Sequence, residues 1–527
     1  MSQESAAAAP DRAGMAERAR QAYDLAPYQS VALMRLHPAR LAACAKLAGL
    51  APPPISSARV LEIGCASGGH IIPLAYAFPN ARFVGVDVSP RQIADGKARI
   101  DRLGLANIEL AAQSFAVLGE ADGDFDVIVA HGLYSWIPEP LRDDLLRVCG
   151  ARLAPNGLAL ISYNVLPGWR MFEIVRDSMI LHAGGEADQQ KRSAKARRLF
   201  AAMKERADLS TSYGRFWRDE AQRMTVGDDA YLTHEVFEDS SAPSSFRDFT
   251  ARAQRFGLAY ACESRVRANR PETVAPDAAA IIEEFSGGDG MAREQYIDIF
   301  SGRTFRESIL IRADEAFRLD ASDRRQRLAA LHMIAPIGLE LRPIEGKPGA
   351  FVIADDAVSL ECDDPAAVES VRRLIARRPS SSRFEDLASE TNDVSRPVVL
   401  STLWRMAEMG LLDVSTEPVA CAEALSARPR ASALATSDAK AGDLTATLRH
   451  APFHMDPLDR LLLARLDGAR SRDSLVDLFV EAVASGGLRA SGPQGPIVER
   501  KALLGALGPE VDRRLANYAR IGLLAPD

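Results

Sequence analysis

The chain has 527 residues, too many for one compact core, so we expect two or three domains. Its composition, 47% hydrophobic and 26% charged, is that of a globular protein, and no apolar run approaches the ~18 residues of a membrane helix. The net charge of −7 argues against a general nucleic-acid binder, because such domains are usually basic.

The ends and cysteines of the chain indicate where it works. Residues 1–15 contain acidic side chains and no basic stretch before an apolar core, which predicts a disordered tail rather than a signal peptide. The six cysteines are scattered, without a cysteine or histidine neighbour at metal-ligand spacing. We therefore expect a cytoplasmic protein that holds no metal ion.

After a helix predicted over 36–50, strands and helices alternate. The expected helices are 70–78, 90–105 and 139–153, and the expected strands are 58–64, 82–89, 107–113, 125–132 and 158–164. Helices of this length between buried strands indicate a parallel sheet with right-handed crossovers. The fold class is therefore α/β, with a Rossmann-like doubly wound sheet.

The alternation stops after residue 164. Residues from about 168 to 250 have helical spacing and many charges, which predicts a helical insertion. Strand-like runs return at 257–266 and 304–312 and would complete the sheet. One domain is therefore expected over 16–312.

From about residue 313 to the end of the chain, the pattern of residues is different. The stretches 379–414 and 467–526 each show helical patterns followed by a short apolar strand, as in a small winged-helix-like α+β unit. The segment between them is rich in alanine and serine and predicts a mobile linker. The expected units are a regulatory domain at 313–414, a linker at 415–443 and a winged-helix-like domain at 444–527.

A glycine-rich turn follows the first strand. Gly64, Ala66 and Gly68 would let the backbone approach a ligand at the carboxyl edge of the sheet, where doubly wound folds hold nucleotide-like cofactors. Asp87 ends the second strand, where a carboxylate can accept both hydroxyls of a ribose. The glycine spacing also fits a dinucleotide loosely. Glu62 favours S-adenosylmethionine instead, because an acid suits its cationic methionine part and would repel a pyrophosphate.

The sequence resembles the bacterial class I methyltransferases that carry a methyltransferase regulatory domain, including the rickettsial protein-lysine methyltransferases that act on outer-membrane protein. The resemblance covers roughly 20–312 and returns at 448–475. The glycine turn is specific only to the superfamily. The motifs AHGLYSW at 130–136 and SYNVLPGW at 162–169 are much narrower.

The resemblance implies a methyltransferase that takes S-adenosyl-L-methionine and releases S-adenosyl-L-homocysteine. The residues it implies at the cofactor are Glu62, Gly64, Ala66, Gly68, Asp87, Val88, Ser114, Phe115 and His131. Class I enzymes often have an acid after the third strand to meet the adenine amino group. The stretch 111–115 has none, so the adenine contact stays open.

Residues after the fourth and fifth strands face the transferred methyl group in this fold. The candidate catalytic residues are Tyr163, Asn164 and His131. The candidate substrate-binding residues are Tyr28, Tyr134 and Trp136, whose rings would attract a lysine cation. Each has a structural alternative, which is core or lid packing for the aromatic rings and a purely structural role for the histidine.

The leading hypothesis is a protein-lysine N-methyltransferase whose C-terminal half docks a protein substrate. The alternatives are a small-molecule methyltransferase and a regulatory or scaffold protein that binds S-adenosylmethionine. We expect neither nucleic-acid binding nor membrane insertion, and the helical insertion suggests a homodimer. The sequence leaves the methyl acceptor open.

Overall fold

The computed structural model describes 29–118, 124–224, 235–237, 241–320, 322–492, 495–497 and 499–526, with six single positions between 14 and 24. The predicted tail at 1–15 falls almost wholly outside these residues, as does Tyr28. Within the described part of the chain, no helix is long and apolar enough to cross a membrane.

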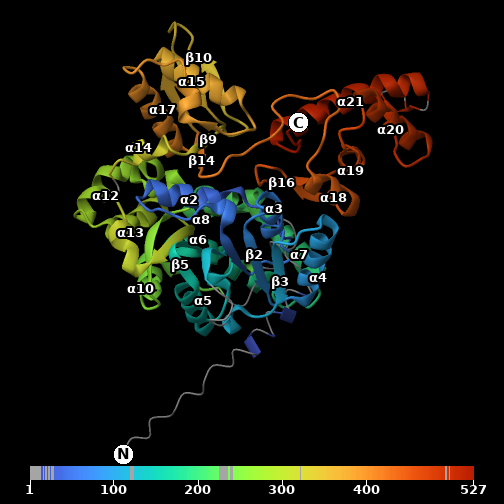
Figure 1. The fold of residues 1–527 in the computed structure, drawn as a ribbon. Coiled ribbons are helices and arrows are strands. Elements are labelled where there is room, and N and C mark those ends of the chain that lie inside the picture. Colours follow the sequence, from blue (N-terminus) through green and yellow to red (C-terminus); the bar gives the residue numbers. More distant parts are fainter. Residues whose placement is uncertain are drawn as a thin grey trace, which may run out of the picture.

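A mixed sheet forms the centre of the first domain (Figure 1). Its strand order is β3-β2-β1-β4-β5-β8-β7, with the short β6 (Ser244–Ser245) paired to the end of β5. The first five strands are parallel, and β8 is antiparallel to both of its neighbours. The seven main strands are β1 (Arg59–Ile63), β2 (Arg82–Asp87), β3 (Ile108–Ala112), β4 (Phe125–Ala130), β5 (Leu153–Leu166), β7 (Leu258–Glu263) and β8 (Phe305–Arg312). Each predicted strand is present.

Helices cover both faces of this sheet because its strands are apolar on both sides. Val60 belongs to the core under the helices α2 (Pro38–Leu47), α3 (Ile71–Ala77) and α4 (Pro90–Leu103). Its neighbour Leu61 belongs to the core under α5 (Glu139–Arg152) and α10 (Phe246–Gln254). This alternation follows from the opposite directions of successive side chains in a strand. Ser89 caps α4 by accepting a hydrogen bond from the N–H of Gln92.

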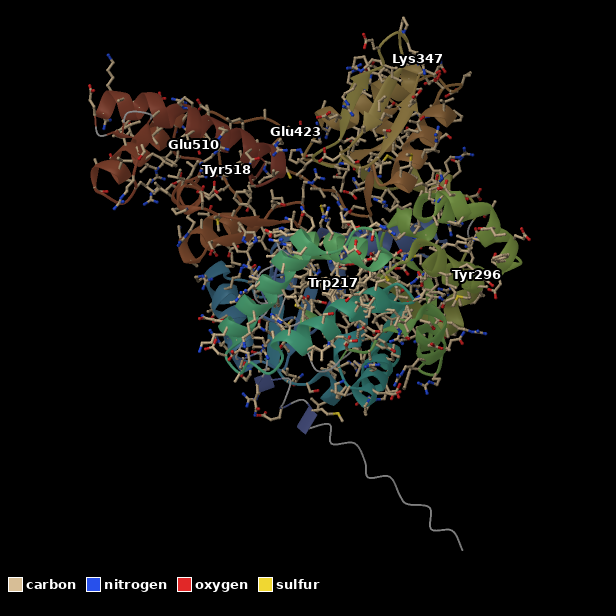
Figure 2. The ribbon with its side chains drawn as sticks, turned by 180° about the vertical axis from the view of Figure 1, so that it is seen from behind. Trp217, Tyr296, Lys347, Glu423, Glu510 and Tyr518 are labelled. Carbon is tan, nitrogen blue, oxygen red and sulfur yellow. The ribbon has the colours of Figure 1, made fainter. Side chains whose placement is uncertain are left out.

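Among its described residues, the predicted insertion contains the helices α6 (Trp169–Ala183), α7 (Gln189–Arg206) and α8 (Ser212–Met224), and the start of α10. The first three enclose a core of their own that includes Trp169, Phe172, Phe200 and Trp217. Figure 2 shows Trp217 among these helices. The insertion is thus a packed helical unit and not a further strand–helix repeat.

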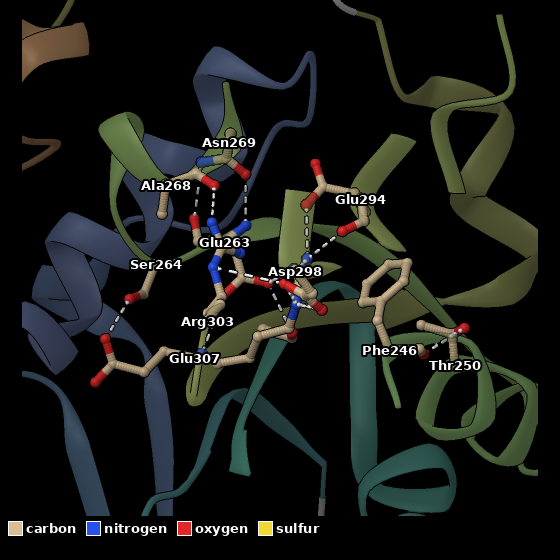
Figure 3. A network of polar contacts seen from close by, with 12 residues as sticks. Phe246, Thr250, Glu263, Ser264, Ala268, Asn269, Glu294, Asp298, Arg303 and Glu307 are labelled. Carbon is tan, nitrogen blue, oxygen red and sulfur yellow. Dashed lines mark hydrogen bonds and ion pairs between the residues drawn. The ribbon is translucent and has the colours of Figure 1, made fainter. Parts of the chain in front are cut away.

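Three helices follow β7, namely α11 (Pro271–Val274), α12 (Ala279–Ser286) and α13 (Gly290–Ser301). The fully buried Arg306 of β8 ties α13 to the sheet through Glu263 at 2.6 Å, Glu294 at 3.1 Å and Asp298 at 2.9 Å. Its guanidinium also lies 4.3 Å from the ring centre of Phe246. Figure 3 shows the three carboxylates gathered around this point. Several partners are needed here because a buried ion is stable only when it is well paired.

Two smaller lobes lie on one side of the sheet domain (Figure 1). The middle lobe shares a core with α2, since Ala43 and Leu47 pack within it. Its elements are α14 (Arg324–Leu328), β9 (His332–Ile334), β10 (Glu340–Pro343), β11 (Phe351–Ala354), β12 (Ser359–Cys362), α15 (Pro365–Ala376), β13 (Ser382–Arg383), α16 (Phe384–Leu387), α17 (Arg396–Met409) and β14 (Asp413–Ser415). The last lobe contains α18 (Ala433–Ala441), β15 (Leu444–Ala446), β16 (Pro452–His454), α19 (Pro457–Leu463), α20 (Arg472–Ala484), β17 (Ser491–Gly492), β18 (Gly495–Pro496) and α21 (Arg500–Ile521).

The predicted linker at 415–443 differs from the structure in its second half. Residues 433–441 form α18, which packs against α4 of the first domain. Arg99 of α4 binds the buried carboxylate of Asp438 at 2.9 and 2.7 Å. The alanines and serines that suggested flexibility instead allow close packing and cap the helix, because the Ser432 hydroxyl accepts a hydrogen bond from Ala435.

Candidate functional site

The turn after β1 has the unusual backbone that its composition predicts. Gly64, Ala66 and Gly68 have φ values of +76°, +49° and +74°, a region that favours glycine. The N–H of Gly64 donates to the carbonyl of Val86 at 2.9 Å, which holds the turn against the end of β2. Among the described residues, a Cβ added to Gly64 would meet only the side chain of Leu133, at 3.8 Å. The turn therefore leaves space above the carboxyl edge of the sheet.

Asp87 connects this turn to the end of β2. Its two carboxylate oxygens accept hydrogen bonds from the N–H groups of Ala66 and Ser89, both at 2.9 Å. Burial raises the pKa of Asp87, and these N–H groups act against that increase. Each oxygen keeps a second lone pair for a ribose hydroxyl. Asp87 thus shapes the turn and remains able to bind a sugar.

Glu62 places a buried carboxyl group just before the turn. It is 8% exposed, and its Oε2 makes no hydrogen bond within the part of the chain that the structure describes. Burial raises the pKa of Glu62 well above its usual range, and the charge of Asp87 raises it further. A buried carboxylate of this kind is stabilised by a cation. The site therefore fits the ammonium group of a methionine moiety.

The predicted adenine side offers fewer polar groups. Val88 and Ser114 are half-buried, and the Ser114 hydroxyl accepts a hydrogen bond from the N–H of Ala116 at 3.3 Å. Phe115 is buried in the core beneath α5. The sequence did not single out Asp24, whose Oδ1 accepts a hydrogen bond from the Ser89 hydroxyl at 2.5 Å. An N-terminal residue thus contacts the end of β2 beside the ribose position.

His131 lies directly after β4 and belongs to a charged cluster. Its Nε2 is 3.5 Å from Oε1 of Glu307 and 3.3 Å from a guanidinium nitrogen of Arg35. Glu307 is buried and also binds Arg265 at 3.2 Å. Burial by itself raises the pKa of Glu307, but the hydrogen bond to His131 and the charge of Arg35 outweigh it and bring the pKa to about 2. Glu307 is therefore a carboxylate at neutral pH.

Sequence reasoning did not identify Glu307 or Arg35. Glu307 lies on β8 opposite Ser162 of β5, and the Ser162 hydroxyl accepts a hydrogen bond from the N–H of Gly132 at 2.8 Å. The available signal was an acid beside Arg306 in the strand-like run at 304–312, ahead of its apolar half. Its partners come from distant segments, so the sequence could not connect them.

The two tyrosines after these strands lie in the core. Tyr134 and Tyr163 are each 1% exposed, and Tyr163 stacks on Phe249 at 3.9 Å between ring centres. Burial raises the pKa of Tyr163 well above its usual range. Because side chains alternate along β5, Tyr163 points to the opposite face from Ser162 and Asn164. The structure thus separates Tyr134 and Tyr163 from His131.

Asn164 and Trp136 differ from these tyrosines. Asn164 is 2% exposed, and its Nδ2 has no partner among the described residues. Its own N–H donates to the hydroxyl of Ser135 at 2.8 Å, which ties it to the loop after β4. Trp136 is half-buried against Trp169 at 6.1 Å, with the guanidinium of Arg176 at 5.6 Å from its ring. Asn164 therefore has an amide end available for a ligand, whereas Trp136 already has a cationic neighbour.

Among the residues that the structure describes, no group of three or more histidine, cysteine or carboxylate side chains is placed to hold a metal ion. The polar side chains described above at the edge of the sheet are those of Glu62, Asp87, His131, Asn164 and Glu307.

Three family models match the chain. They are a methyltransferase domain at 60–157, a predicted methyltransferase regulatory domain at 228–312 and a PKMT, C-terminal winged helix domain at 427–523. An uncharacterised protein of Rickettsia prowazekii is 35% identical over 234 residues, which cover 44% of this chain and 94% of the relative. A second one from that organism is 26% identical over 496 residues, or 91% of this chain and 89% of the relative.

Solved structures match almost the whole chain. PKMT2 from Rickettsia typhi has a TM-score of 0.82 at 25% identity, covering 94% of this chain and 100% of that one. The same protein in complex with AdoHcy has a TM-score of 0.83 at 24% identity, with the same coverage. The likeness therefore extends across both C-terminal lobes.

Proposed function

We propose that this chain, which belongs to the class I S-adenosylmethionine-dependent methyltransferases with a methyltransferase regulatory domain, methylates lysine side chains of a protein. The observation that carries this proposal is the likeness to PKMT2 along 94% of the chain, in line with the sequence resemblance to rickettsial protein-lysine methyltransferases. It includes the C-terminal lobe, which matches a winged helix domain described for PKMT. A methyltransferase acting on a small molecule has no need of these lobes, whereas a protein substrate gains docking surface from them.

The donor side follows from the turn and the two carboxylates. S-adenosylmethionine supplies an electrophilic methyl group on a sulfonium. Glu62 would bind the ammonium group of the methionine part, and Asp87 the ribose hydroxyls. The strained turn lets the backbone approach the ligand without side chains in the way. These residues bind and orient the donor, and alignment of this kind supplies a large share of such a rate enhancement.

The acceptor side needs a group that removes a proton, because a lysine amine arrives as an ammonium ion and attacks only when neutral. We assign this role to His131, which lies after β4 where residues of this fold face the methyl group. Glu307 would hold the imidazole and stabilise it once it is protonated, since its carboxylate stays charged. The amide of Asn164, which lacks a partner in the described chain, would orient the incoming amine.

The test is incubation of the full-length protein with radiolabelled S-adenosylmethionine and a cell lysate. We expect label in protein bands, with methyl-lysine identified by mass spectrometry of the labelled band. Glu62→Gln should strongly reduce the label at donor concentrations below the Kd of the variant, which ties the label to the donor site. Label only in the organic extract would instead indicate a small-molecule acceptor, and cofactor binding without transfer would indicate a regulatory protein.

A further inference from the structure

The turn between β15 and β16 reaches from the C-terminal lobe into both other parts of the molecule. The N–H of Leu448 donates to the carbonyl of Gly522 at 2.7 Å, which anchors the turn in its own lobe. Arg449 donates to the carbonyl of Ala335 in the middle lobe at 3.0 Å. His450 lies with its Nε2 2.9 Å from Nδ1 of His70 in the first domain. Neighbouring side chains of one turn thus contact different domains.

His70 is the residue that follows the glycine turn and precedes α3. Its Nδ1 also accepts a hydrogen bond from the backbone N–H of Leu33 at 3.3 Å. Because the N–H of Leu33 donates to Nδ1, that nitrogen carries no proton, so His450 must be the donor in the contact between the two rings. His70 and His450 are 3% and 4% exposed, so the pair is sealed from water. Both contacts hold His70 at Nδ1, whereas its Nε2 has no hydrogen-bond partner among the described residues.

A short N-terminal segment is held between the glycine turn and the C-terminal lobe. The Ser30 hydroxyl accepts a hydrogen bond from the N–H of Gly69 at 2.8 Å. A Cβ added to Gly69 would lie 2.0 Å from the carbonyl oxygen of Ser30, so the two backbones touch. On the other side, Ala32 packs with Leu434 and Ala446 of the lobe. A shift of the lobe would therefore be transmitted directly to the turn.

The backbone of His450 indicates that this arrangement has an energetic cost. His450 has a φ of +63°, a conformation that few residues other than glycine adopt. Such strain persists only where the surrounding contacts enforce it. Here those contacts are the hydrogen bond to His70 and the edge of the His37 ring, whose centre is 5.2 Å away.

We propose that His450 is a positioning residue for the methyl-donor site. By donating to Nδ1 of His70, it holds the start of α3 and the end of the glycine turn in the geometry that binds S-adenosylmethionine. The C-terminal lobe thereby contributes to donor affinity without touching the donor. This role is independent of which molecule accepts the methyl group.

The experiment measures the Kd of S-adenosylhomocysteine by titration calorimetry on the full-length protein. His450→Asn keeps the positive φ, which asparagine tolerates well, but its shorter amide does not reach His70. We expect the Kd to increase about three- to tenfold, the effect of one lost hydrogen bond. His450→Gln places an N–H near the position of the lost Nε2 and should restore most of the affinity.

The matched control is His454→Asn, which changes an exposed histidine on β16 of the same lobe and should leave the Kd unchanged. Hydrogen exchange of 64–70 provides a second readout and should become faster in His450→Asn but not in the control. A Kd and an exchange rate equal to those of the wild type in folded His450→Asn would overturn the proposal. So would an equal loss of affinity in His450→Gln, because its side chain retains the donor.

Discussion

At the scale of single residues, the proposed donor site is built at a cost in stability. Glu62 is buried, unpartnered in the described chain and next to a second carboxylate, which no stable core requires. Such violations of ordinary core chemistry occur where a ligand completes the arrangement. His131 is different, because Glu307 and Arg35 already surround it in the absence of a ligand. The two residues can therefore be tested separately.

Glu62→Gln should weaken cofactor binding and stabilise the ligand-free protein. The Kd of S-adenosylmethionine should increase about 10- to 100-fold, because a charged hydrogen bond is lost. In the unfolded chain, Glu62 releases its proton above pH 4.5, whereas in the folded protein it keeps the proton to a higher pH. The free energy of unfolding therefore falls as pH rises above 4.5. Glutamine has no proton to release. The free energy of unfolding at pH 7 should therefore increase by about 1–3 kcal/mol.

Calorimetry and denaturant unfolding measure these two effects. The exposed Glu109 on β3 gives the control variant Glu109→Gln, which should change neither quantity. An unchanged Kd in Glu62→Gln would show that the carboxylate does not bind the donor.

His131→Asn should slow methyl transfer without weakening donor binding. Removal of a general base lowers turnover about 10²- to 10⁴-fold, whereas the donor contacts at Glu62 and Asp87 stay intact. Single-turnover transfer and the Kd of S-adenosylhomocysteine separate the two effects. A large increase in Kd with turnover unchanged at saturating donor would instead make His131 a cofactor-binding residue.

At the scale of the elements, β8 connects two parts of the sheet domain. One is the segment at 228–312 that matches the regulatory-domain model, and the other is the edge of the sheet at His131. Arg306 holds α13 from one position of this strand, and Glu307 turns to the other face toward His131. Because successive side chains of a strand point in opposite directions, two neighbouring residues serve two unrelated sites. The regulatory segment at 228–312 is thus continuous with the sheet through β7 and β8.

Arg306→Met should strongly destabilise the sheet domain. It leaves Glu263, Glu294 and Asp298 buried without their shared cation, and breaking a buried ion pair in this way costs about 3–5 kcal/mol. Urea unfolding followed by tryptophan fluorescence measures the loss. Arg312→Met on the same strand breaks only the exposed pair with Asp314 and should have a much smaller effect. Equal stability of Arg306→Met and the wild type would mean that the carboxylates take up protons at little cost.

At the scale of the whole molecule, the C-terminal lobe docks on the donor-binding half of the sheet domain. Its contacts include the Arg99–Asp438 ion pair, the hydrogen bond from the N–H of Ala433 to the Tyr76 hydroxyl at 3.1 Å and the hydrogen bond between His450 and His70. The C-terminal lobe is therefore packed directly against the part of the sheet domain that carries the glycine turn.

Acid should loosen this docking. Burial, together with positive neighbours, lowers the pKa of both His37 and His70 from 6.5 to about 3. The neighbour that lowers the pKa of His37 is Arg40. Those that lower the pKa of His70 are His37, His131 and Arg35. Those that lower the pKa of His450 are His70, His37, Arg40 and Arg99.

With the lobe undocked, His37 and His70 should take up protons near pH 6.5, and with the lobe docked only near pH 3. Docking free energy is therefore lost as pH falls through this range. At pH 5 the loss is about 2 kcal/mol for the first histidine. Small-angle scattering at pH 7.5 and pH 5 should show an increase in the radius of gyration, and a constant radius would contradict the prediction. Because His450→Asn removes one of these histidines, its radius of gyration should change less between pH 7.5 and pH 5.

The sequence by itself determined the order of strands and helices in the sheet domain, and it predicted a donor site at the edge of that sheet. These depend on short segments: a glycine turn, Glu62 two residues before it and Asp87 at the end of the next strand, which parallel pairing brings to the same edge. Only the tertiary structure decided on which face of the sheet each candidate side chain lies. Tyr163 and Asn164 are neighbours in sequence, yet strand alternation buries one against Phe249 and directs the other to the opposite face. The structure alone also joined Glu307 to His131, and His450 to His70 across 380 residues of chain, because such contacts arise from domain packing, which no local pattern encodes.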